Sequence, residues 1–328
     1  MNRKRWIALA VAAVLFFISI GVQMAASVAT ADMDEFFSFS PFDEKVIEEG
    51  SPTNKIAVIS LNGVIQDTGQ SAWNTYAYNH SRFLESIETA GKDPLVSGII
   101  LRVNTPGGGV VESDEIHDKI IKVQEEYNKP VYVSMGNMAA SGGYYVSAPA
   151  DKIIAHPSTL TGSIGVIMQT INIADLAEDL GVDFTTLKSG EFKDIMSSTR
   201  EMTDDERDIL QDIIDEMYGE FVQVIADGRD MPEERVREIG DGRVYTGKQA
   251  YELELVDGLG DLNDTIQIMK EDQQLEDAQV VEYTSSLGFN EIFGMTLKQT
   301  FTQEAKIDGV LELLREHNAP RAMYLYSE

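Results

Sequence analysis

GNMAASGGYYVSA, residues 136–148, is the stretch on which the interpretation of this sequence depends. It follows the apolar run 130–135 (PVYVSM), which predicts a strand, and its small residues predict a turn that puts Ser141 at the start of a helix. Free N–H groups there favour developing negative charge, and Gly142 lets a substrate backbone come close to its own amide. The pattern fits either a nucleophile beside an oxyanion donor or an ordinary turn with Ser141 as N-cap.

Strands and helices alternate on both sides of this stretch. β-branched apolar runs predict buried strands within 55–65 and 96–109, and helical periodicity predicts helices at 81–90 and 112–127. Short apolar strands that alternate with helices imply parallel strands and an α/β fold. Further along the chain we expect helices at 173–180, 233–238 and 248–253, a capping box at 203–206 that opens a long helix, a strand after Val280 and an amphipathic stretch at 297–317.

A second glycine motif, Asn104–Gly109 (NTPGGG), comes directly after the strand predicted within 96–109. An ordinary strand-to-helix turn would explain it. The functional interpretation is that the N–H of Gly108 meets the amide of Gly142 across a bound carbonyl oxygen. Two such donors form an oxyanion hole, and the loss of one costs about 3 to 4 kcal/mol of barrier stabilisation.

The base that would activate Ser141 is less evident. The four histidines offer no clear candidate. His80 and His317 lie in polar contexts that predict exposure. His117 lies beside the apolar face of a predicted helix, and His156 lies in a turn before Pro157. A triad through His156 remains an alternative. Lys193, 52 residues after Ser141 in a Gly-Glu-Phe-Lys segment, is the stronger candidate. A lysine amine becomes a usable base when desolvation lowers its pKa from about 10.4.

The N-terminal segment predicts export. Residues 6–24 carry no charge over 19 positions and follow Arg3, Lys4 and Arg5, so we expect one transmembrane helix with the N-terminus in the cytoplasm and the rest outside it. A cleaved signal peptide with a site near Ala29–Ala31 is the alternative. Residues 25–54 would form a juxtamembrane linker. The absence of cysteine excludes thiol nucleophiles and thiolate metal sites.

The chain is strongly acidic, with a formal net charge of −29. Beyond the predicted span, 23 basic residues face 55 acidic ones, which argues against binding to nucleic acids or to anionic lipid headgroups. HExxH, P-loop and paired Cys/His motifs do not occur in the sequence, so we expect no cofactor and no metal.

Five motifs, in this order, resemble signal peptide peptidase A (SppA), a family of membrane-bound serine peptidases: NTPGG (104–108), MAASGGYY (138–145), PSTLTGSIGV (157–166), the Lys193 segment and GRVYTGKQAYELELVDGLG (242–260). The resemblance covers most of residues 55–265. It implies a ClpP/crotonase-like fold, a superhelix of repeated β-β-α units, in a peptidase domain over 55–285, with 286–328 as a C-terminal helix and tail. It also implies Ser141 as nucleophile, Lys193 as general base, the amides of Gly108 and Gly142 as oxyanion hole, and Ser163 as the residue that orients the lysine.

The resemblance further implies the substrates and the assembly. Thr105 stands where serine is common and His156 where asparagine is expected, which affects local packing only. The chain contains one copy of a domain that other members carry twice, and such short forms are expected to form rings in which Lys193 can reach Ser141 of a neighbour. The implied substrates are released signal peptides and other short apolar peptides in or near the membrane. The tail APRAMYLYSE (319–328) is itself extended and apolar, and we expect it to suit the substrate groove.

Two alternatives belong to other classes. A crotonase-type acyl-CoA enzyme would share the fold and the paired amides, but it would not need the export signal or a hydroxyl beside the oxyanion hole. A ring-forming membrane scaffold with a catalytically quiet peptidase fold would not be labelled covalently at Ser141.

Overall fold

The computed structural model describes residues 42–67, 78–285 and 322–326. The chain divides into two compact units, Met1–Asp43 and Glu44–Glu328, and the description that follows concerns the second. The predicted transmembrane helix at 6–24 and the amphipathic stretch at 297–317 lie outside the described residues. Within the described ranges, no helix combines the length and the apolar character that crossing a membrane would need.

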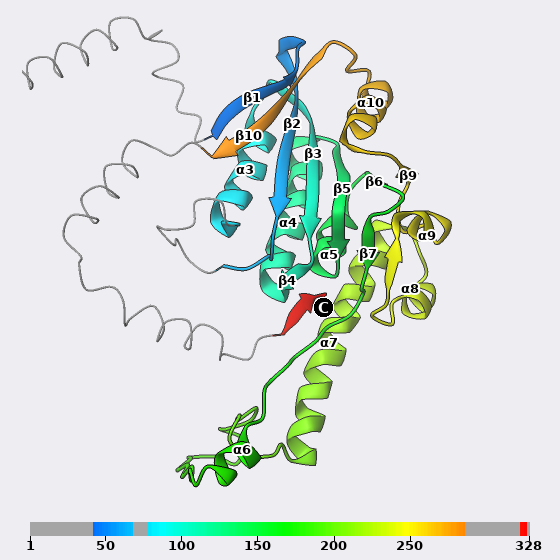
Figure 1. The fold of residues 1–328 in the computed structure, drawn as a ribbon. Helices are drawn as coiled ribbons and strands as arrows, with labels where there is room; N and C mark the ends of the chain where they lie inside the picture. The colour runs from blue at the N-terminus through cyan, green and yellow to red at the C-terminus, as the bar shows by residue number, and fades with distance from the viewer. Residues whose placement is uncertain (1–41, 68–77, 286–321, 327–328) are drawn as a thin grey trace, which may run out of the picture. The chain divides into compact units, whose positions relative to one another are not determined.

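The second unit is built on a largely parallel sheet with helices packed against it (Figure 1). The pairs β10–β2, β2–β3, β3–β5, β5–β6 and β6–β9 are all parallel. In sheet order the strands are β1 (Phe42–Glu48), β10 (Ala278–Ser285), β2 (Ser51–Asn62), β3 (Val96–Thr105), β5 (Val131–Ala140), β6 (Lys152–Ala155) and β9 (Gly258–Leu259). The predicted α/β fold with parallel strands is confirmed.

Both faces of this sheet are covered. Ile99, Ile100 and Leu101 follow one another in β3 and are all fully buried, although successive side chains in a strand point to opposite faces. The helices are α3 (His80–Lys92), α4 (Val110–Tyr127), α5 (Gly142–Ser147), α6 (Ala174–Asp179), α7 (Asp204–Gly228), α8 (Glu233–Ile239), α9 (Gly247–Glu252) and α10 (Leu262–Gln273). Ile266 and Met269 of α10 pack on the sheet in one apolar cluster with Ile56 and Ile100.

The strand before Ser141 is longer than predicted. The sequence predicts a turn from Gly136, whereas β5 continues to Ala140. Its last residues gain a new parallel partner, because Met138, Ala139 and Ala140 pair with β7 (Leu160–Gly162), which also pairs antiparallel with β8 (Val244–Thr246). This second pairing carries the strand up to Ser141 itself.

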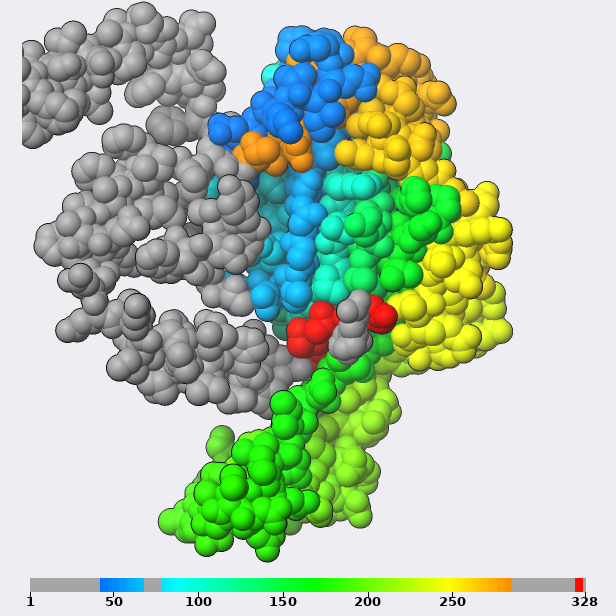
Figure 2. Space-filling model, viewed as in Figure 1, coloured from blue at the N-terminus to red at the C-terminus, as the bar shows by residue number. Residues whose placement is uncertain are grey.

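Helix α7 is 25 residues long and begins at the predicted capping box, in which Thr203 and Glu206 exchange hydrogen bonds. In Figures 1 and 2 its N-terminal part, together with α6 and the segment that joins α6 to α7, extends away from the sheet. We call residues 166–203 the projecting segment. Its position matters because it contains Lys193.

Candidate active site

Ser141 lies between the end of β5 and the start of α5 in a strained backbone conformation. Its φ is 54° and its ψ is −116°, and a non-glycine residue at positive φ costs on the order of 1 to 3 kcal/mol. The backbone N–H of Ser141 donates to the carbonyl of Gly162 at 2.8 Å. The hydroxyl does not cap α5. Ser141 is therefore not an ordinary N-cap, and its surroundings hold it in a conformation that it would otherwise avoid.

The glycines of the second motif form a short strand, β4 (Gly107–Gly109), beside Ser141. Gly107 has a φ of 99°, and a Cβ on it would lie 2.7 Å from the backbone nitrogen of Gly142. Ile65 borders one edge of β4, where its N–H donates to the carbonyl of Gly107 and its own carbonyl accepts from the N–H of Gly109, both at 2.8 Å. Only glycine at position 107 allows the two backbones to approach this closely.

The other edge of β4 pairs with the C-terminal tail. Strand β11 (Met323–Leu325) runs antiparallel to β4 and places Tyr324 opposite Gly108 (Figure 1). The N–H of Tyr326 donates to the carbonyl of Pro106 at 2.9 Å. Because hydrogen-bonded pairs alternate along an antiparallel ladder, Tyr324 and Gly108 also form a hydrogen-bonded pair. On the edge of β11 that faces away from β4, Met323 exchanges two 3.0 Å backbone hydrogen bonds with Ile167.

The carbonyl oxygen of Tyr324 lies where the two glycine segments meet. A Cβ on Gly107 would be 2.0 Å from this oxygen, and a Cβ on Gly142 would be 3.1 Å from it. The register turns the N–H of Gly108 toward the same oxygen. The structure therefore brings Gly108 and Gly142, which lie 34 positions apart in the sequence, to one carbonyl group beside Ser141.

The side chain of Tyr324 enters an aromatic cluster. It is fully buried, its ring stacks on Tyr145 at 4.9 Å between centroids, and it contacts Phe221 of α7 at 4.6 Å. Its hydroxyl donates to the carbonyl of Met217 at 3.1 Å. Burial raises the pKa of Tyr324 well above its usual range, so the hydroxyl stays protonated and remains a donor. The rings of Tyr145 and Phe221 therefore bind one aromatic side chain, that of Tyr324, from the extended tail.

Ser163 lies close to Ser141. It follows Gly162, whose carbonyl accepts the N–H of Ser141, and it is itself largely buried. Ser163 also has a positive φ, of 50°, and its N–H donates to the carbonyl of Arg243 at 2.8 Å. The structure thus gathers four of the five predicted site residues, Ser141, Gly142, Gly108 and Ser163.

Lys193, the fifth predicted site residue, lies in a different part of the structure. It is exposed on the projecting segment, and its neighbour Asp194 binds Arg200, which in turn binds Glu206 in the first turn of α7. Ser141 instead lies near Phe221, because Tyr145, whose N–H bonds the Ser141 carbonyl, packs on that ring at 5.1 Å. Glu206 and Phe221 are about 22 Å apart along the helix. One chain alone does not bring Lys193 to Ser141, and their pairing stays a prediction.

The histidines differ partly from expectation. The prediction that His80 is exposed is wrong: its side chain is 4% exposed and lies between Tyr78, at 2.7 Å, and Glu115, at 2.6 Å. The polar residues around it in the sequence are its partners. His156 is exposed, and its Nδ1 accepts from the N–H of Ser158 at 3.1 Å. His317 lies outside the described residues.

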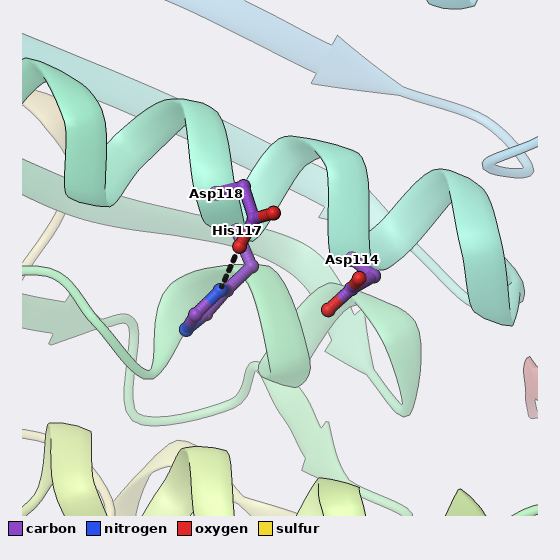
Figure 3. A group of neighbouring side chains, drawn as sticks. All are labelled: Asp114, His117 and Asp118. Carbon is purple, nitrogen blue, oxygen red and sulfur yellow. Dashed lines mark hydrogen bonds and ion pairs between the residues drawn. The ribbon is translucent and has the colours of Figure 1, made fainter.

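Three side chains with the spacing of metal ligands lie next to Tyr145 of the aromatic cluster. Asp114, His117 and Asp118 project from one side of α4, and their ligand atoms lie within 4.8 Å of one another (Figure 3). Asp114 accepts a hydrogen bond from the hydroxyl of Tyr145 at 2.8 Å, and His117 is 3.3 Å from Asp118. Both carboxylates are exposed. The contact with Tyr145 gives Asp114 a structural role, because it fixes a ring of the aromatic cluster.

A serine held at a strained turn, with two glycine segments close to one carbonyl oxygen beside it, fits the layout of enzymes that cleave acyl bonds with a serine nucleophile. Comparison with known proteins narrows this class. The model of peptidase family S49 matches residues 123–276, a range that contains both Ser141 and Lys193. The chain belongs to peptidase family S49, and the predicted membership of the SppA family is confirmed.

Three relatives illustrate the match. A candidate signal peptide peptidase SppA of Enterococcus faecium is 38% identical over 99% of both chains. Protease 4 of Salmonella typhi is 35% identical over 71% of this chain and 37% of its own length. The chloroplastic serine protease SPPA of Arabidopsis thaliana is 32% identical over 66% of this chain and 32% of its own length. This chain is therefore a serine peptidase that acts on peptides.

Proposed function

We propose that this protein is a membrane-anchored serine endopeptidase that uses Ser141 and Lys193 to degrade released signal peptides. One observation carries the catalytic part of the proposal: the carbonyl of Tyr324, in an extended antiparallel strand, lies opposite Gly108 and close to Gly142 beside Ser141. A peptide substrate bound in the same way would present its scissile carbonyl to the nucleophile. Addition of a strand to an exposed edge is a common mode of peptide binding.

The chemistry follows from this placement. Ser141 Oγ attacks the carbonyl carbon, its proton passes to the neutral amine of Lys193, and the amides of Gly108 and Gly142 stabilise the oxyanion. The C–N bond then breaks as Lys193 returns the proton to the leaving amine. Water, deprotonated by the same lysine, hydrolyses the acyl-enzyme. In this scheme Ser163, next to Ser141, orients the lysine amine.

We propose that Lys193 comes from a neighbouring subunit. The projecting segment supports this, because it carries exposed apolar side chains that a second copy would cover: Ile171, Leu176, Leu180, Phe184 and Leu187, the last of them 95% exposed. A head-to-tail contact between copies would bring this segment to the next active site and, if the rotation closes, would form a ring.

The tail also supports a substrate preference. If a substrate binds as residues 322–326 do, the residue before the cut places its side chain against both Tyr145 and Phe221. The site would favour an aromatic or large apolar side chain there. Signal peptides are rich in apolar residues, and the predicted membrane helix at 6–24 would hold the enzyme on the extracytoplasmic side where they are left.

The test is hydrolysis of a synthetic apolar signal peptide by the full chain in detergent, with Ser141→Ala and Lys193→Ala prepared singly and then mixed after dissociation and reassembly. Each variant alone should be inactive. If the dyad forms between subunits, equal mixing should restore about a quarter of wild-type activity, the share of head-to-tail interfaces with both residues intact.

Recovery of no activity would place the dyad within one chain. Lys193→Ala with near wild-type activity would refute Lys193 as the base and leave His156 as the next candidate. A wild-type protein without peptidase activity, with or without its tail, would refute the proposed function and favour a scaffold.

A further inference from the structure

Thr105 is the last residue of β3 and lies directly beneath the oxyanion hole. It is fully buried, and it pairs with Ala139 of β5. Its hydroxyl makes two contacts with one residue: Oγ1 accepts from the N–H of Gly107 at 3.0 Å and donates to the carbonyl of Gly107 at 3.3 Å. A single side chain thus holds both polar groups of the glycine whose φ is 99°.

The two hydrogen bonds between Thr105 and Gly107 also affect Gly108, through the peptide bond that joins Gly107 to Gly108. The carbonyl of Gly107 and the N–H of Gly108 belong to one planar trans unit, so they point in opposite directions and turn together. Donors on one side, the Ile65 N–H at 2.8 Å and the Thr105 hydroxyl, hold the carbonyl away from the site. The N–H of Gly108 is thereby held toward the reacting carbonyl. Without these donors the unit could turn, since glycine populates positive and negative φ about equally.

The methyl group of Thr105 reaches the other half of the oxyanion hole. A Cβ placed on Gly143 would lie 2.7 Å from Thr105 Cγ2 and 3.1 Å from the Thr105 carbonyl. Gly143 follows Gly142, the second donor, in the first turn of α5. Thr105 therefore packs against one amide segment and hydrogen-bonds the other.

We propose that Thr105 is a positioning residue that fixes the Gly107–Gly108 peptide in the orientation needed for oxyanion stabilisation; this inference rests on the proposed peptidase function. The hydroxyl is the decisive group. Valine has the shape of threonine but leaves the buried N–H of Gly107 without its acceptor, whereas serine keeps the hydroxyl and loses only the methyl.

The test compares Thr105→Val and Thr105→Ser in the full-length assembled protein. Thr265→Val serves as the matched control, because Thr265 is also fully buried and donates to a backbone carbonyl, that of Asp261 at 2.8 Å, at the start of α10. Thr105→Val should lower kcat about 10- to 100-fold with KM changed less than about threefold, since Ile65 still holds the carbonyl of Gly107. Thr105→Ser should recover most of kcat, and Thr265→Val should keep it.

A second measurement separates positioning from loss of folding. A peptide aldehyde forms a tetrahedral oxyanion with Ser141, whereas the matching peptide alcohol does not. Thr105→Val should weaken aldehyde binding about 10- to 100-fold and leave alcohol binding nearly unchanged. If Thr105→Val does not fold, Thr105→Ala replaces it in both measurements.

The inference is overturned if a folded variant without the hydroxyl keeps kcat within about threefold of wild type, or if Thr105→Ser loses as much as Thr105→Val. Parallel losses of aldehyde and alcohol binding would also overturn it. Failure of the proposed function is distinguishable, because then Ser141→Ala would not abolish the wild-type activity against which these variants are compared.

Discussion

Removal of the C-terminal tail should activate the enzyme toward added peptides. Residues 322–326 occupy the edge of β4 that a substrate strand would need, so the tail and the substrate compete for Gly108 and Gly142. Deletion of residues 319–328 should therefore raise kcat/KM for a synthetic apolar peptide.

The size of the effect follows from the contacts. Burial of the Tyr324 ring contributes about 2 kcal/mol, its contacts with Tyr145 and Phe221 about 2 more, and six hydrogen bonds about 1 each. Ordering residues 322–326 costs about 8 kcal/mol. The difference of about 2 kcal/mol means that the tail occupies the site about 30 times as often as it leaves it, so deletion should raise kcat/KM by roughly that factor.

The assay is initial-rate hydrolysis of a quenched fluorescent peptide well below KM. The matched control replaces residues 322–326 with a Gly/Ser sequence of the same length, which keeps the chain but removes Tyr324 and its contacts. Both proteins should show a similar gain, and Tyr324→Ala alone should give most of it. An unchanged rate in all three would refute the reasoning, because the tail would then not compete with substrate.

Three further predictions concern the surroundings of the site. Gly107→Ala should abolish turnover in a folded protein, since its Cβ would meet backbone atoms at 2.0 and 2.7 Å; measurable kcat would contradict this. Asp114→Ala should free the ring of Tyr145 and raise KM about tenfold for peptides with an aromatic residue before the cut, a loss of about 1.4 kcal/mol, with little change in KM for alanine at that position. Hydrogen bonds from Arg200 lower the pKa of Glu206 to about 2 from 4.5, so the stability they add is complete above pH 4.5 and is lost as the pH falls toward 2. Hydrogen exchange in the first turn of α7 should rise over that window in wild type, and an Arg200→Met variant should exchange fast at every pH; equal protection in the two proteins would refute the assignment.

Much of the fold follows from local sequence patterns. Buried strands, amphipathic helices and the capping box at Thr203 appear close to their predicted positions, because periodicity and capping are properties of neighbouring residues. The glycine motifs predicted a close approach of two backbone segments for the same reason, since such an approach requires glycine, and the structure brings the two segments together. His80 was mispredicted because its partner Glu115 lies 35 positions away and converts a polar context into a buried one.

The sequence by itself therefore determined the α/β class, and it predicted Ser141 as nucleophile and the amides of Gly108 and Gly142 as oxyanion donors. Only the tertiary structure decided how these parts meet. It set the positive φ of Ser141 and the orientation of the Gly107–Gly108 peptide plane, and it paired Tyr324 with Gly108, 216 positions away. It also placed Lys193 near the first turn of α7 and Ser141 near Phe221, about 22 Å further along that helix. Each of these depends on contacts between distant segments, whose register is set by packing of the whole unit and leaves no local pattern in the sequence.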